Sequence, residues 1–137
     1  MAGRMSPLHN PASGLTATQS HPPVSRNGDT TNTVNGASID LRGKRGAYFV
    51  LNAGALTGSA NYAAHLQSGD NPADAANANW TNVNTTTYPN AAVAVKTNAN
   101  AAFEMDFDPV RGDAAHVRAV LVTDANAAVI GLTAVTF

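Results

Sequence analysis

Short segments of alternating apolar and polar residues, separated by clusters of turn-forming residues, fill the chain from residue 37 to the C-terminus. Phe103–Asp108 shows this pattern most clearly, with phenylalanine or methionine at every second position and carboxylates between them. Side chains alternate between the two faces of a strand, whereas a helix repeats about every 3.6 residues. Helical patterns are weak throughout this region, so the sequence predicts an all-β fold.

Two of these segments predict a hairpin of residues 103–108 and 115–122. Antiparallel pairing brings their apolar positions together on one face and their charged positions together on the other. Opposite charges across neighbouring strands contribute roughly 0.2–1 kcal/mol each. A slip of one residue would place carboxylates in the core, so the register is well specified. The expected cross-strand pairs are Glu104 with Arg118 and Asp106 with His116.

The remaining segments complete a set of about seven or eight short antiparallel strands. Ala47–Ala53 is nearly all apolar, which is typical of a central strand buried on both faces. A short hairpin is expected over residues 30–42, turning at Asn35-Gly36. This spacing of strands and turns predicts a β-sandwich or a jelly-roll-like small barrel over residues 37–137. The other strands are expected at 61–67, 80–83, 91–96 and 128–137.

Residues 1–36 differ from this body and predict a flexible or extended N-terminal arm. Met1–Asp29 contains four prolines, many polar residues and no apolar period. Such a segment cannot bury enough apolar area to offset its ordering entropy. Two interpretations stay open: a tail without fixed structure, or an arm that becomes ordered on a neighbouring subunit or partner. In the second case we expect Pro22, Pro23 and Arg26 to be partner contacts.

Charge and composition exclude several classes of protein. Eight basic and nine acidic residues give a net charge of -1, so the basic patch of a nucleic-acid-binding protein is not expected. The chain has no cysteine, which excludes disulfides and thiolate metal sites. No apolar run reaches the roughly 18 residues of a membrane-spanning helix. We therefore expect neither a nucleic-acid partner nor a membrane partner.

Catalytic and metal-binding patterns are weak. In the predicted hairpin His116 lies opposite Asp106, and this pairing explains the histidine without a catalytic role. No serine in a strained turn accompanies the pair, as a catalytic triad would require. Asp106, Asp108 and Asp113 could offer oxygen ligands to Ca²⁺. Their spacing matches no calcium loop, however, and Arg111 would repel the ion. The sequence therefore predicts no enzyme, no cofactor and no metal site.

Three aromatic residues allow two interpretations. Trp80, Tyr62 and Tyr88 could line an exposed surface that stacks against sugar rings, which is the arrangement of a carbohydrate-binding module. Large aromatic side chains are also common in the core of a β-sandwich. The core is the preferred interpretation for Trp80.

Three short motifs follow one another in the body of the chain. This series is similar to a pattern that recurs among small virion proteins of tailed bacteriophages, and it resembles head-decoration or cement proteins over about residues 38–137. The turn at residues 71–79 is longer than in that pattern, and the N-terminal arm is not part of it. The motifs are Leu66-Gln67-Ser68-Gly69-Asp70, Trp80-Thr81-Asn82-Val83 and His116-Val117-Arg118-Ala119-Val120.

Proteins of this kind sit outside the major capsid shell, often as trimers at three-fold positions. The resemblance therefore implies a capsid decoration protein that binds the major capsid protein, associates as a homotrimer and stabilises the shell. It also implies a place on the virion exterior after assembly in the bacterial host cytoplasm. A head fibre, tail or baseplate component and a carbohydrate-binding module stay open as alternatives.

Overall fold

A computed structural model describes residues 15–26, 32–69, 80–109, 115–124 and 128–137. These residues form ten strands and no helix, which confirms the all-β prediction. No part of the described chain is a helix of the length and hydropathy needed to cross a membrane. The strands are β1 (Thr16–Arg26), β2 (Asn32–Asn35), β3 (Ile39–Asp40), β4 (Ala47–Leu56), β5 (Tyr62–Gly69), β6 (Thr81–Asn82), β7 (Ala92–Lys96), β8 (Ala101–Phe107), β9 (His116–Thr123) and β10 (Ala128–Thr136).

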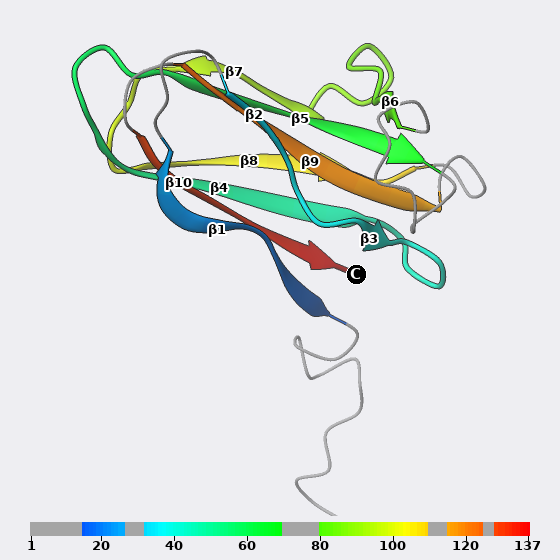
Figure 1. Cartoon of the computed structure of the whole chain (residues 1–137). Coiled ribbons are helices and arrows are strands. Elements are labelled where there is room, and N and C mark those ends of the chain that lie inside the picture. Colours follow the sequence, from blue (N-terminus) through cyan, green and yellow to red (C-terminus); the bar gives the residue numbers. More distant parts are fainter. Residues whose placement is uncertain (1–14, 27–31, 70–79, 110–114, 125–127) are drawn as a thin grey trace, which may run out of the picture.

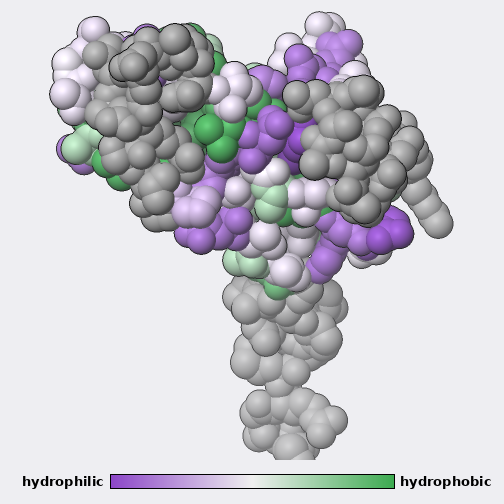
Figure 2. Space-filling view, in the orientation of Figure 1, coloured by the Kyte–Doolittle hydropathy of each residue, from purple (hydrophilic) through white to green (hydrophobic). Residues whose placement is uncertain are grey.

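The strands form two antiparallel sheets that lie in two layers (Figure 1). The first, sheet A, has the order β1-β10-β4-β8. The second, sheet B, has the order β2-β9-β5-β6, with β3 also pairing with β9 and β7 with β5. Strands that follow one another in the chain therefore often belong to different sheets. On the face shown in Figure 2, hydrophobic residues form small areas separated by neutral and hydrophilic ones.

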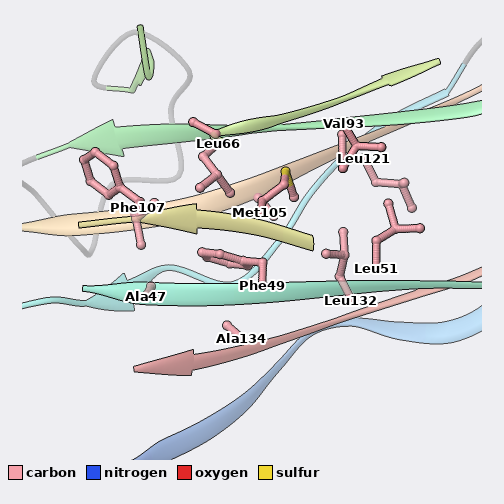
Figure 3. Close-up of a cluster of buried hydrophobic side chains, with 14 of the residues drawn as sticks. Ala47, Phe49, Leu51, Leu66, Val93, Met105, Phe107, Leu121, Leu132 and Ala134 are labelled. Atoms are coloured by element: carbon pink, nitrogen blue, oxygen red, sulfur yellow. The ribbon is translucent and has the colours of Figure 1, made fainter. Parts of the chain in front are cut away.

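The core lies between the two sheets, and alternate residues of each strand supply it. On β5, Tyr62, Ala64 and Leu66 are buried as their alternation predicts. Side chains from β4 and β8 meet them from sheet A (Figure 3). The largest of the fully buried side chains in this cluster are Tyr62, Phe49, Leu51, Leu66, Met105, Leu121, Ile130 and Leu132.

Burial on both faces occurs in β9 rather than in β4. The inward positions of β4 are buried, but Tyr48 and Val50 on its outer face are only half-buried. The prediction that Ala47–Ala53 is a central strand is therefore right in position and wrong in burial on both faces. In β9 even His116 and Arg118 on the outer face are buried. Because the outer face of β9 carries polar residues, the sequence pattern could not predict that it is buried.

Residues 16–26 and 32–35 of the N-terminal segment are part of the sandwich. β1 pairs with β10 and forms an edge of sheet A, while β2 pairs with β9. The prediction of an arm extending to residue 36 is therefore wrong for these two strands, and residues 1–14 lie outside the described part. The predicted hairpin over residues 30–42 is also wrong, because β2 and β3 both pair with β9 instead of with each other.

The predicted hairpin of residues 103–108 and 115–122 is wrong as well. β8 pairs with β4 in sheet A, and β9 pairs with β5 in sheet B. Both strands are present, and their apolar positions face the same core. The strands lie on opposite sides of this core, one in each sheet, rather than side by side. An alternating pattern fits a pair of neighbouring strands and a pair of facing strands equally well. The match between the two sequence patterns therefore could not distinguish these arrangements. Glu104 lies opposite Val50, Asp106 opposite Tyr48, Arg118 opposite Gln67, and His116 opposite Asp40 and Gly69.

Candidate interaction surface

Arg118 forms a polar network on the outer face of sheet B. Its Nε donates to Oε1 of Gln67 at 2.9 Å, and Nε2 of Gln67 donates to Oδ1 of Asn82 at 2.9 Å. The guanidinium carbon lies 4.5 Å from the centroid of the Trp80 ring. Only 3% of Arg118 is exposed, and this burial lowers its pKa. The hydrogen bond to Gln67 and the contact with the Trp80 ring offset the free-energy cost of removing the guanidinium group from water.

Trp80, Tyr62 and Tyr88 do not form an exposed platform. Trp80 is 6% exposed and Tyr62 is fully buried. The hydroxyl of Tyr62 donates to the carbonyl of Asn98 at 2.7 Å. Tyr88 packs edge-on against Phe107, with the ring centroids 5.0 Å apart. The alternative of a carbohydrate-binding surface made by these three residues is therefore wrong.

His116 lies beside Asp40 instead of Asp106. Its Nε2 is 3.6 Å from Oδ1 of Asp40, and the side chain is buried. Among the residues that the structure describes, neither ring nitrogen of His116 has a hydrogen-bond partner. Arg42 donates to both oxygens of Asp40 from Nε and to Oδ2 from Nη2, and these bonds hold the pKa of Asp40 well below its usual range. The carboxylate therefore stays ionised and bound to Arg42, which leaves it poorly placed to act as a base.

The carboxylates considered for Ca²⁺ are engaged by protein groups where they are described. Nδ2 of Asn90 donates to Asp106 at 3.2 Å, and Nε of Arg45 is 3.3 Å from Asp108. Asp113 and Arg111 lie outside the described residues. Within the described ranges, no group of three or more histidine, cysteine, aspartate or glutamate residues could hold a metal ion.

His21 connects the two sheets, a role that sequence reasoning missed. The side chain is buried, and its Nε2 lies 2.8 Å from the carbonyl oxygen of Val34 in β2. Because a carbonyl only accepts, Nε2 carries the proton there, and Nδ1 accepts from the Ser20 hydroxyl at 3.1 Å. No sequence pattern predicts this contact, because His21 lies in a polar segment that contains prolines.

The pH dependence of stability should reflect His65 on β5. Burial and the charge of Arg118 lower the pKa of His65 below its usual 6.5. As the pH falls through that value, the unfolded chain takes up the proton more readily than the folded one. We therefore expect the free energy of unfolding to decrease below about pH 6.5, and to decrease less in His65→Gln. Urea titrations across this range measure the two slopes, and equal slopes would contradict the assignment.

The residues predicted as partner contacts lie on β1. Pro22 is exposed, and Pro22 and Pro23 fall in the stretch where the β1–β10 register shifts. Arg26 ends the strand opposite Ala128. Their contact with a partner stays a prediction.

The outer face of sheet A is uncharged along β4 and β10 and carries carboxylates along β8. Tyr48, Val50, Thr133 and Val135 are half-buried on neighbouring strands of this face. Glu104 and Asp106 lie on the same face of β8, opposite Val50 and Tyr48, and a hydrogen bond with Glu104 raises the pKa of the Tyr48 hydroxyl. Among the described residues, no strand packs against this face.

Comparisons with known proteins show similarity only to solved structures. No family model matches the chain, and a search among curated proteins also finds no match. The crystal structure of PirA is 13% identical, with a TM-score of 0.45, over 88% of this chain and 91% of that chain. The crystal structure of SPBc2 prophage-derived protein YomS is 12% identical, with a TM-score of 0.48, over 89% of this chain and 91% of that chain. Both similarities are too low to bear on function.

Proposed function

We propose that this chain is a bacteriophage head decoration protein that binds the outside of the major capsid protein shell and stabilises it. The observation that carries the proposal is the network around Arg118. The motifs that resemble cement proteins are separate segments of the chain, and their side chains meet: Gln67 from the first, Trp80 and Asn82 from the second, and Arg118 from the third. The pairing of β5 with β9 and with β6 brings the three motifs together on the outer face of sheet B.

The outer face of sheet A is the surface that we propose to contact the shell. A decoration protein needs no reactive group, because it acts by burying area at a seam that repeats over the shell. The uncharged part of this face, along β4 and β10, presents valine, threonine and tyrosine side chains, which lose less hydration on contact than charged groups do. The homotrimer implied by the sequence motifs rests on those motifs alone and is not part of this proposal.

Purified virions of the parent phage provide the test. We expect quantitative mass spectrometry to find many copies of this chain, in a fixed ratio to the major capsid protein. A few copies per particle would assign the chain to a head fibre, tail or baseplate and contradict decoration. Absence from the virion would contradict a structural role in the particle altogether.

A pair of variants tests the proposed contact face. Val135→Lys places a charge beside Tyr48 and Ala17 on the outer face of sheet A, and we expect it to weaken binding to shells that lack this chain. Ala63→Lys places the same charge on the outer face of sheet B, opposite Val122, as the matched control. Equal binding by both variants would overturn the choice of face without overturning decoration.

A further inference from the structure

The first half of β1 is an open edge of sheet A. We use this name for residues Leu15–Gln19, which carry no charge. Leu15 is 47% exposed, and Thr16, Ala17 and Gln19 are exposed as well. In the described part of the chain β1 pairs along its length with β10 and lies at the end of the sheet order.

The hydrogen bonds at the C-terminus determine which backbone groups of β10 face β1. Phe137 donates to the carbonyl of Gly46 at 3.1 Å, and Gly46 donates back at 3.2 Å. This mutual pair directs the backbone groups of Phe137 toward the β4 side. Successive residues of an antiparallel strand alternate between its two neighbours. Thr136 and Ala134 therefore face β1.

The same alternation continues into β1. Thr16 lies opposite Thr136, and Thr18 lies opposite Ala134, so these two threonines bond to β10. The N–H and C=O groups of Leu15, Ala17 and Gln19 must then point away from the sheet. No backbone group in the described part of the chain bonds to them.

Only the second half of β1 has the features that usually protect an edge strand. Edge strands are commonly blocked by prolines, charges or irregular pairing, because a regular edge accepts another strand. Pro22 and Pro23 lie in the second half, together with two shifts of register between Gln19 and Val24. The open edge has a regular register, no proline and no charged residue.

We propose that the open edge pairs antiparallel with the open edge of a second copy of this chain. The two-fold axis passes through Ala17, so that two four-stranded sheets become one continuous sheet. Ala17 then lies opposite Ala17 of the second copy, Thr16 opposite Thr18, and Leu15 opposite Gln19.

Self-complementarity is the argument for a second copy as the partner. An antiparallel pair exchanges hydrogen bonds only where outward groups meet outward groups. In the Ala17-centred register Leu15, Ala17 and Gln19 meet only one another. The small alanine stands at the axis, and threonine faces threonine, which is a favourable cross-strand pair.

A single introduced cysteine tests both the pairing and its register, because the chain has no cysteine of its own. Residues in a hydrogen-bonded antiparallel pair have Cα atoms about 5.5 Å apart, within the roughly 4.4–6.8 Å that a disulfide spans. We expect Ala17→Cys to form covalent dimers on mild oxidation. Gln19→Cys is the matched control, since its two copies would lie about 14 Å apart. Dimers from Gln19→Cys and none from Ala17→Cys would overturn the proposal.

Sedimentation of the wild type and of two proline variants, none of which contains cysteine, provides the second test. We expect a dimer for the wild type and a stable monomer for Ala17→Pro, because the lost N–H points outward. Thr18→Pro should instead lower the free energy of unfolding, because its N–H bonds to β10. A monomeric or trimeric wild type, or an unchanged dimer of Ala17→Pro, would overturn the proposal. None of these results depends on binding to a capsid shell.

Discussion

Removal of residues 1–26 should leave the protein unable to fold stably, whereas removal of residues 1–14 should change the free energy of unfolding by less than about 0.5 kcal/mol. The shorter deletion ends before β1, and the longer one removes all of it. The prediction of a separable arm would instead have both deletions leave the folded body intact. The two truncations therefore distinguish a strand of the sandwich from an appendage.

The large effect expected for the longer deletion has three physical sources. β1 pairs with β10 at eight positions, and a net contribution of roughly 0.5–1.5 kcal/mol per hydrogen bond makes such a ladder substantial. Loss of the buried His21 also removes the hydrogen bond to Val34 that connects β1 to sheet B. β10, whose inward residues are in the core, becomes an exposed edge. Together these terms reach a large part of the roughly 5–15 kcal/mol that stabilises a typical domain.

Circular dichroism during urea denaturation measures the outcome. The cooperative transition of the wild type should persist in the shorter truncation and disappear, or move to much lower urea, in the longer one. His21→Ala within the full chain is the intermediate variant, because it removes one connection but keeps the ladder. A cooperative transition at the wild-type midpoint in the longer truncation would show that β1 is dispensable.

The fold class could be predicted from the sequence because alternation is a local property. β5 and β8 lie where their patterns place them, and the residues expected to face the core on each strand do so. The pairing of these strands could not be predicted in the same way. β8 and β9 present apolar faces to one core from opposite sheets, and the same residues would fit a hairpin equally well.

β1 shows why a polar strand escapes sequence reasoning. Its stability comes from backbone pairing with β10, the strand furthest from it in sequence, and from the buried contacts of Ser20 and His21. Neither the backbone pairing nor these side-chain contacts require apolar residues at regular intervals, so the segment shows no apolar period. The prolines that made it look like an arm are compatible with an edge strand that has irregular pairing.

The candidate site could be predicted only in part. The motifs containing Gln67, Trp80 and Arg118 were recognised separately, but their convergence on one face of sheet B depends on the pairing of β9 with β5 and of β5 with β6. A buried arginine beneath a tryptophan also has no pattern of its own in a sequence. Its expected partner, Glu104, lies on β8, which pairs with β4 in the other sheet.

Gly46→Ala should lower the free energy of unfolding by about 3 kcal/mol. Gly46 is buried where the chain enters β4, and it exchanges hydrogen bonds with Phe137. A methyl group there would lie 2.5 Å from the backbone oxygen of Phe107 and 3.1 Å from the Cα atom of Asp108. Both obstacles are backbone atoms, so relief requires a shift of the β4–β8 pairing rather than a rotation of a side chain.

Gly54→Ala is the matched control, because Gly54 lies within β4 near the end of the strand that is further from Gly46. The added methyl group would lie 3.5 Å from Cβ of Val129, an ordinary van der Waals contact. Because alanine also restricts the unfolded chain more than glycine does, we expect this variant to be unchanged or stabilised by up to about 1 kcal/mol. Thermal and urea unfolding of the two variants measure the difference. Equal stability of Gly46→Ala and Gly54→Ala would mean that β4 and β8 are further apart at this end than the register between Ala47 and Phe107 implies.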